Sequence, residues 1–159
     1  KGLKILLNLL EPHGVIKLGL YSEKARQHVV HVREFIKKNK FNNTAEGIRD
    51  CRRSIINKKE DKMFKEILNR SDFYTISSAR DLMFHVQEHR FNLSQISQMI
   101  SDFDLEFLGF TNEKIKNKYS RKFPEDKENI ILENWNKFEN LEPGTFIGMY
   151  NFWLRKKIH

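Results

Sequence analysis

The chain has 159 residues, of which 39% are hydrophobic and 31% are charged, and its formal net charge is +8. This length suits one domain with a sizeable core. The longest apolar stretch, residues 3–10, is interrupted by Lys4 and Asn8 and is too short to span a membrane, and no small-residue cleavage site follows it as in a signal peptide. A single cysteine, Cys51, excludes an internal disulfide and a cysteine-based zinc cluster, and a reducing cytoplasm is the simplest location.

The positive charge is concentrated in the first part of the sequence. Residues 1–60 hold 14 Lys and Arg against 6 Asp and Glu, which gives +8, whereas residues 61–159 hold 15 of each. The chain also starts at Lys1 rather than Met and opens directly in a helical pattern. This opening indicates a fragment of a longer protein, although removal of a tag would leave the same mark.

The first 21 residues predict a helix followed by a strand. Leucines recur at helical spacing until Pro12 and Gly14 end the helix with a turn. Residues 15–21 (VIKLGLY) are mostly apolar and bounded by turn signals, which is typical of a buried strand. Helical spacing then returns, so residues 22–80 predict a helical insertion, in which Thr44 caps the second helix.

Residues 81–110 predict a strand, a helix and another strand. Residues 82–87 (LMFHVQ) alternate enough for a strand but also suit a helix, and the local pattern leaves both open. Asn92 and Gln95 occupy the two positions of a capping box, so a helix follows them. Residues 105–110 (LEFLGF) then alternate as a strand does.

Residues 111–159 predict helices, interrupted by Pro124 and by Pro143 with Gly144. The apolar face of the last helix would consist of Phe146, Met149, Tyr150 and Trp153. Helical spacing favours a packed core face here over a platform for stacking. Taken together, the elements predict one α/β domain, residues 1–159, with few strands and a helical C-terminus.

The stretch HVQEH, residues 85–89, matches the H-x-x-E-H signature of inverted zinc peptidases, whose two histidines bind the metal while the glutamate acts as base. Three fixed positions arise easily by chance. A zinc site also needs a third protein ligand, which in those peptidases lies farther downstream than this chain reaches. The motif must be helical, yet it leads straight into the Asn92 cap. We therefore expect no metal site.

Two basic segments, REFIKKNK and RDCRRSIINKK, place Lys and Arg close together, as contacts with nucleic-acid phosphates require. The same charges suit the solvated faces of amphipathic helices, or a pocket for an anionic small substrate. No recognition helix, Gly-rich phosphate loop or Ser/His/Asp arrangement accompanies them. A basic helical domain that binds nucleic acid is the alternative function, and Cys51 is interpreted as an inert core thiol.

Two segments together resemble the distal half of class I S-adenosylmethionine-dependent methyltransferases. LLNLLEPHGVIKLGLYS (6–22) is similar to the helix, L-x-P-x-G turn and fifth strand of many of these enzymes. DLMFHVQEHRFNLSQISQMISDFDLEFLGF (81–110) is similar to their run of Asp, His, an acidic residue, an aromatic residue and a helix ending in L-x-F. This second segment resembles a bacterial subgroup often fused to tetratricopeptide repeats. The resemblance covers roughly residues 3–22 and 72–155.

The resemblance implies part of a Rossmann-like sheet, whose last three strands lie in the order fifth, seventh, sixth, with the seventh antiparallel. Residues 15–21, 82–87 and 105–110 would form this part, and the helical insertion would follow the fifth strand, where such enzymes often place substrate-covering elements. The edge of strand 15–21 that the fourth strand would occupy is left free. Because an apolar free edge recruits a partner, we predict a homodimer through it, or a partly disordered strand.

The resemblance also implies a function. The cofactor-binding half, with its Gly-rich first turn and ribose-binding acidic residue, is missing from this sequence. We therefore expect S-adenosylmethionine in the parent enzyme, no cofactor and no activity for this chain alone, and recognition of a methyl acceptor as its contribution. The acceptor itself stays open. The acceptor-side candidates are Tyr21, Arg26, Arg80, Asp81, His85, Glu88 and His89.

Overall fold

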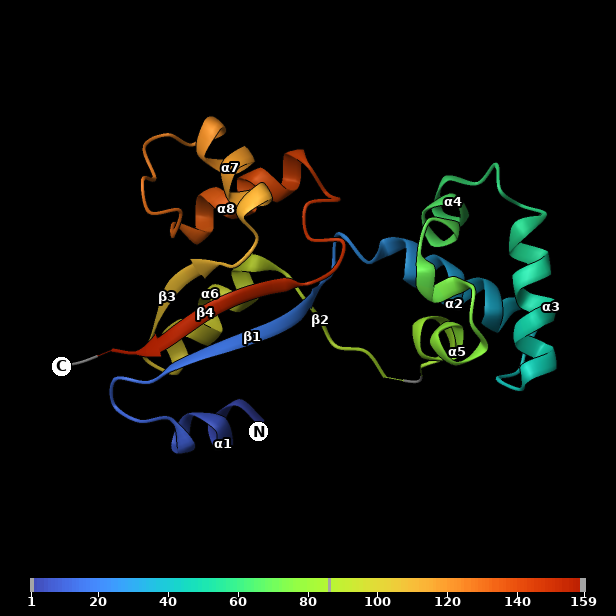
Figure 1. Ribbon diagram of the computed structural model, residues 1–159, viewed down its shortest axis with the longest axis horizontal. Helices are drawn as coiled ribbons and strands as arrows, with labels where there is room; N and C mark the ends of the chain where they lie inside the picture. The colour runs from blue at the N-terminus through green and yellow to red at the C-terminus, as the bar shows by residue number, and fades with distance from the viewer. Residues whose placement is uncertain (1, 86, 158–159) are drawn as a thin grey trace. The chain divides into compact units, whose positions relative to one another are not determined.

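The computed structural model of the protein describes residues 2–85 and 87–157, which form a mixed α/β structure of eight α-helices and a four-stranded sheet (Figure 1). It divides into two compact units. Lys1–Ala25 together with His89–His159 form one, called here the sheet unit, and Arg26–Glu88 form the other, the helical unit. Within the described residues, every helix is too short or too polar to cross a membrane.

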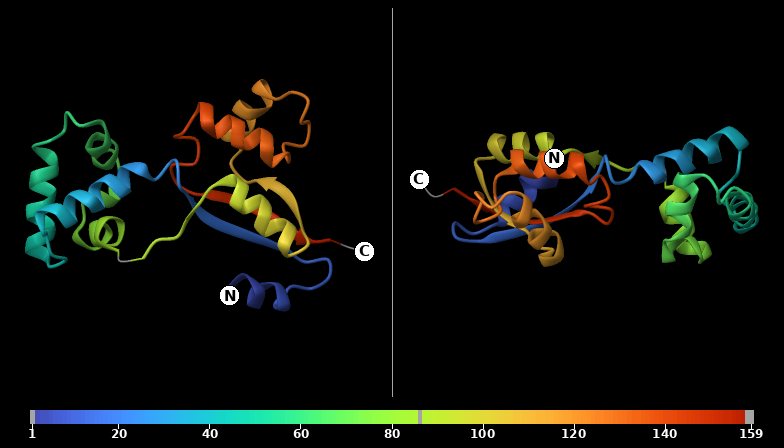
Figure 2. Two further views of the ribbon diagram at one scale, coloured as in Figure 1. Left: turned by 180° about the vertical axis from the view of Figure 1, so that it is seen from behind. Right: turned by 90° about the horizontal axis from the view of Figure 1, so that it is seen from above.

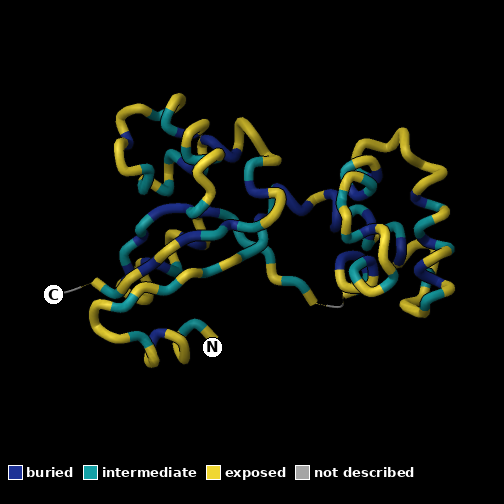
Figure 3. The backbone as a smooth tube through the Cα atoms, in the orientation of Figure 1, coloured by how far each residue is buried: buried dark blue, intermediate teal, exposed yellow. Residues whose placement is uncertain are grey.

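The helical unit contains four α-helices and one short 3₁₀ helix. They are α2 (Gln27–Asn39), α3 (Ala45–Ile56), α4 (Lys62–Leu68), η1 (Ser71–Phe73) and α5 (Ile76–Phe84). Their apolar stripes meet in a core of their own, visible as dark segments in Figure 3. The predicted cap is confirmed, because the Thr44 side chain accepts a hydrogen bond from the Gly47 N–H. Cys51 is fully buried in this core, and burial raises the pKa of its thiol to about 12.

The sheet unit contains the remaining four helices and all four strands. In chain order these are α1 (Gly2–Leu9), β1 (Val15–Ser22), β2 (Arg90–Phe91), α6 (Leu93–Asp102), β3 (Leu105–Phe110), α7 (Glu113–Lys122), α8 (Leu132–Leu141) and β4 (Tyr150–Lys156). The strand order is β2-β1-β4-β3. β1 and β2 are parallel, and β4 is antiparallel to both β1 and β3.

One face of the sheet is packed and the other is open. Because side chains alternate along a strand, Phe152 and Leu154 of β4 point into the aromatic core, which also contains Leu93, Ile96 and Ile100 of α6. The ribbon of α6 lies along the sheet (Figure 2). Trp153 and Arg155 point the opposite way and are exposed. The predicted capping box of α6 is confirmed, since the Asn92 and Gln95 side chains each accept a hydrogen bond from the other's backbone N–H, at 2.8 and 2.9 Å.

The strand predicted for residues 82–87 is wrong. α5 continues to Phe84, His85 follows it as a non-helical cap, and Val86 lies outside the described residues. Leu82 and Met83 are both buried in the helical core. Since consecutive residues of a strand point to opposite faces, burial of this adjacent pair agrees with a helix.

The helical prediction for the end of the chain is also wrong. Residues 150–156 form β4, which pairs along its length with β1 and β3, so the sheet has four strands rather than three. Tyr150, Phe152 and Leu154 are buried, whereas Trp153 is not. The spacing that imitates a helix from Phe146 to Trp153 therefore spans a turn and the first half of a strand.

Candidate functional site

The carboxyl ends of β1 and β3 lie at one edge of the sheet. Both strands are antiparallel to β4, so they run in the same direction, and β4 begins where they end. Ser22 ends β1, Phe110 ends β3 and Tyr150 begins β4. In open α/β sheets, ligands bind outside the carboxyl ends of the parallel strands. This edge is therefore the first place to look for a site.

A buried carboxylate of α8 joins the end of β1 to the start of β4. Glu139 of α8 is fully buried and accepts hydrogen bonds from the hydroxyl of Ser22 at 2.6 Å and from the hydroxyl of Tyr150 at 2.7 Å. Ser22 Oγ in turn accepts the Ala25 N–H at 3.1 Å. Burial, with the Glu139 carboxylate adding to it, raises the pKa of the Tyr150 phenol. Since all three side chains are inaccessible, they fix α8 to β1 and β4 and do not touch a solute.

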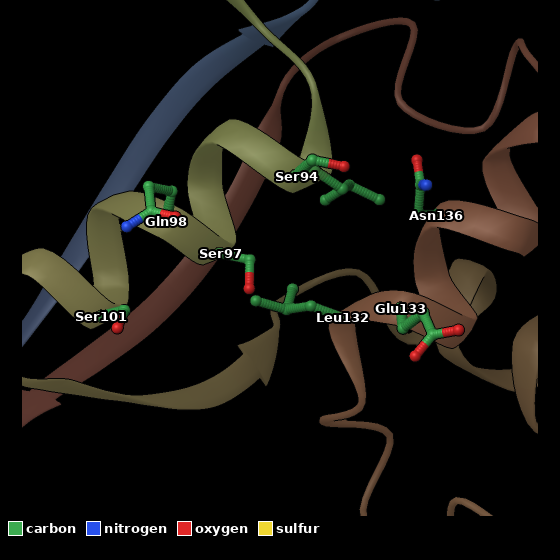
Figure 4. Close-up of a pocket in the computed structure, with 8 residues that line it drawn as sticks. Ser94, Ser97, Gln98, Ser101, Leu132, Glu133 and Asn136 are labelled. Atoms are coloured by element: carbon green, nitrogen blue, oxygen red, sulfur yellow. The ribbon is translucent and has the colours of Figure 1, made fainter.

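A polar cavity of about 450 Å³ lies between α6 and α8 (Figure 4). Its polar lining comes from Ser94, Ser97, Gln98 and Ser101 of α6 and from Glu133 and Asn136 of α8. Lys24, which follows β1, donates to the side-chain oxygens of Asn136 at 3.3 Å and Asn140 at 2.5 Å. The ammonium group thus ties the end of β1 to the wall of the cavity.

A second cavity of about 390 Å³ lies beyond the end of β3. Thr111, Asn112 and Asn151 contribute polar groups, and Ile147 and Met149 contribute apolar surface. Binding sites for small organic groups typically combine an apolar lining with a few polar groups. Of the two cavities, this one has the lining better suited to an organic acceptor group.

Two of the seven residues predicted as acceptor-side candidates meet, but in the helical unit. The side chains of Arg26 and Glu88 are 4% and 6% exposed and form a two-pronged ion pair, Nε–Oε1 at 3.2 Å and Nη2–Oε2 at 2.5 Å. Arg33 Nη2 lies 3.1 Å from the same Glu88 Oε2 and 2.9 Å from the carbonyl of Leu82. Burial raises the pKa of Glu88, but hydrogen bonding and the charges of Arg26 and Arg33 outweigh it, and the net shift is downward.

Of the other five candidates, Tyr21 and His89 belong to the sheet unit, and Arg80, Asp81 and His85 belong to the helical unit. Tyr21 is half-buried near the end of β1, opposite Arg90 of β2 in the register, whereas Arg80, Asp81, His85 and His89 are exposed. Arg80 donates to the carbonyl of Asn43 at 3.1 Å, and His85 Nδ1 accepts the Gln87 N–H at 3.3 Å.

The H-x-x-E-H stretch has neither the helix nor the free glutamate that a zinc peptidase needs. α5 ends before His85, and Glu88 is engaged by two arginines. Across residues 2–85 and 87–157, no group of three or more His, Cys, Asp or Glu side chains is arranged to hold a metal ion.

Sequence reasoning missed the residues that build the edge, namely Ser22, Glu139 and Tyr150. Glu139 offered a signal, because it lies four residues after Trp135 and directly after Phe138, on the apolar face of α8. A carboxylate on a buried helix face needs a hydrogen-bonding partner. Ser22 and Tyr150 carried no comparable signal in the sequence.

No protein-family model and no curated protein matches this sequence. Among solved structures, the chain is similar to PKMT2 from Rickettsia typhi, with a TM-score of 0.67 and 13% sequence identity. The similarity covers 98% of this chain and 31% of the PKMT2 chain, so this chain spans about a third of that protein's length. At this identity the likeness establishes a shared fold and nothing finer.

Proposed function

We propose that this chain is the acceptor-side portion of an S-adenosylmethionine-dependent methyltransferase. The observation that carries the proposal is the extent of the likeness to PKMT2, a Rickettsia protein lysine methyltransferase: it includes 98% of this chain. The structural likeness therefore includes both the sheet unit and the helical unit, at a sequence identity of 13%.

The topology of the sheet supports the proposal independently. A methyltransferase sheet would end with strands in the order fifth, seventh, sixth, and β1, β4 and β3 lie in that order, with β4 antiparallel to both neighbours. In this assignment residues 105–110 are the sixth strand and residues 150–156 the seventh. The helical unit follows β1, where substrate-covering insertions are expected.

The residues of this chain do not fit the cofactor itself. A Gly-rich turn after a parallel strand lets the backbone approach a nucleotide closely, but Glu23, Lys24 and Ala25 follow β1. Among the described glycines, Gly109 alone has a positive φ, 110°, and it lies inside β3. The chain's contribution would be to position an acceptor at the carboxyl edge, since methyl transfer depends chiefly on positioning.

The test compares the chain alone with the longer product of its own reading frame. The DNA upstream of the Lys1 codon is sequenced, and any longer product is expressed and titrated with S-adenosylmethionine by isothermal titration calorimetry. We expect an upstream strand, Gly-rich turn and acidic residue, saturable binding by the longer product, and none by this chain alone. A start codon directly before the Lys1 codon, or a longer product that fails to bind, would contradict the proposal.

Nucleic-acid binding is the rival proposal, and part of its basic surface is engaged within the helical unit. On α3, Arg53 forms an ion pair with Asp50, and the guanidinium of Arg52 lies 5.4 Å from the ring centre of Phe73. Binding of generic duplex or single-stranded nucleic acid with a steep dependence on salt would favour the rival.

A further inference from the structure

The helical unit has a cavity of its own, about 610 Å³ in volume, between α2 and the start of α4. It is larger than either cavity at the carboxyl edge of the sheet. The connection between α3 and α4 closes its third side through Lys58, Glu60 and Asp61. The methyltransferase proposal gives this cavity no role.

The floor of the cavity is aromatic. The ring centres of Phe35 and Phe64 are 5.0 Å apart, and the ring of His31 is 4.9 Å from Phe64. Phe64 is almost completely buried, so the floor is anchored in the core of the unit. Aromatic faces attract cations, and their apolar surface accepts the methylene stem of a long side chain.

The wall of the cavity carries a fixed negative charge. Asp61 accepts the backbone N–H groups of Met63 at 2.7 Å and Phe64 at 3.3 Å, and its carboxylate lies 3.3 Å from His31 Nε2. Desolvation alone would raise the pKa of Asp61, but these hydrogen bonds and the nearby His31 lower it, so the carboxylate stays ionised at neutral pH.

Two further carboxylates stand on the rim. Glu34 and Glu60 are exposed and line the cavity. The helical unit holds 14 Lys and Arg against 9 Asp and Glu, a net charge of +5, whereas the lining of this cavity holds three carboxylates against two lysines, a net charge of −1. This local excess of negative charge in a basic unit selects for a cation.

Lys38 and Lys58 also reach the rim, on long flexible stems, whereas Asp61 is held in place. They would repel a run of basic residues. A single basic side chain flanked by neutral or acidic residues meets only the net charge of −1 that the three carboxylates and these two lysines give the lining.

We propose that this cavity binds the side chain of a lysine within a peptide segment, its stem on Phe35, which Phe64 supports from below, and its ammonium among the carboxylates. The proposal deepens the methyltransferase function and rests on it for the choice of lysine, the acceptor type of PKMT2. Binding of a peptide by this chain needs no cofactor, so it is tested separately from methyl transfer.

The experiment is a titration of the ¹⁵N-labelled 159-residue chain, followed by ¹H–¹⁵N correlation spectra. The probes are acetyl-Ala-Lys-Ala-amide and the same peptide with norleucine, which keeps the stem and lacks the ammonium. We expect saturable shifts of the amides of α2, residues 58–61 and Phe64 with the lysine peptide, and about fivefold weaker binding of norleucine. Equal affinities would overturn the lysine assignment, and shifts that are scattered or never saturate would overturn the site.

Variants of the rim carboxylates test their contribution to binding separately from any effect on folding. Glu34→Gln with Glu60→Gln should weaken binding of the lysine peptide about fivefold and leave the rest of the spectrum unchanged. The matched control is Glu46→Gln with Glu66→Gln, two carboxylates of the same unit that do not line the cavity. If the control weakens binding as much as the rim variant, general charge and not this cavity attracts the peptide, and the proposal fails.

Discussion

Arg26 and Glu88 are the first and last residues of the helical unit, so their ion pair joins the two ends of one segment of the chain. Arg33 adds a second positive charge to the same carboxylate. The Glu88 carboxylate balances part of the positive charge of both guanidinium groups, and removing its charge leaves both groups without this counter-charge. The ion pair therefore links the two ends of the helical unit. Neither residue lines either of the two cavities described for the sheet unit.

Glu88→Gln should destabilise the helical unit by about 3–5 kcal/mol, because it leaves buried positive charge uncompensated. The measurement is urea denaturation followed by circular dichroism. Glu34→Gln, an exposed carboxylate of the same unit, is the control and should change stability by less than about 0.5 kcal/mol. A loss for Glu88→Gln no larger than that of the control would mean that the pair does not close the unit.

The same pair predicts the pH dependence. The pKa of Glu88 is lowered in the folded protein, so its contribution is complete above the unfolded pKa, near the model-compound value of 4.5, and is lost as pH falls through the lower folded pKa. Stability of the natural chain should therefore fall on acidification below about pH 4.5 more steeply than that of Glu88→Gln. Parallel pH profiles of the two proteins would contradict this account.

The sequence predicts side-chain contacts where a local motif specifies them, and it does not predict contacts between residues that are distant along the chain. Asn92 with Gln95 is a four-residue pattern, and its geometry follows from the helix start alone. Ser22 and Glu139 meet across 117 positions of sequence, and nothing near either residue specifies the other. Arg26 and Glu88 were singled out from the resemblance, which gave no indication that they pair.

At the scale of elements, α6 depends on its amino-terminal capping box. Asn92→Ala removes the acceptor for the Gln95 N–H and should cost about 1 kcal/mol of unfolding free energy. Urea denaturation of the variant measures this cost. Ser97→Ala, an exposed interior position of the same helix, should be neutral or slightly stabilising. A cost at Ser97 equal to that at Asn92 would show that the cap contributes nothing particular.

The two incorrect secondary-structure predictions have one physical cause. Both segments have apolar residues that fit helical as well as strand periodicity, and burial in the tertiary structure decides which of the two forms. Residues 82–84 fit both patterns, and the core of the helical unit selected the helix. In residues 150–156 the alternation of Tyr150, Phe152 and Leu154 was present, but the preceding Phe146 and Met149 extended it into an apparent helical stripe. Only the pairing of β4 with β1 and β3 separates the two interpretations.

At the scale of the whole molecule, the sheet unit has an open edge. β4 pairs with β1 from Val15 to Leu20, whereas on the opposite side β2 pairs only with Tyr21 and Ser22. Nearby in sequence, α1 exposes Ile5, Leu6 and Leu9. Within the described residues, the length of β1 before Tyr21 thus offers unpaired backbone groups. Natural proteins usually cover or disrupt such an edge.

We predict that this edge joins two copies of the chain into a dimer. Two copies related by a two-fold axis can pair β1 antiparallel to itself, because a two-fold axis reverses the direction of a strand that crosses it. Light scattering after size-exclusion chromatography should give a mass that rises with concentration towards twice the 19.1 kDa of the chain. Hydrogen exchange at the amides of residues 15–20 should slow over the same range of concentration.

A charged residue at the edge should oppose this association, since lysine is a common device against edge pairing. Val15→Lys places it on an exposed position of β1 and should shift the chain towards the monomer. Ile131→Lys removes an exposed apolar residue of the same unit away from the edge and should leave the dimer intact. A monomer at every concentration, with fast exchange in β1, would instead mean that the edge stays open and that the strand is partly disordered in solution.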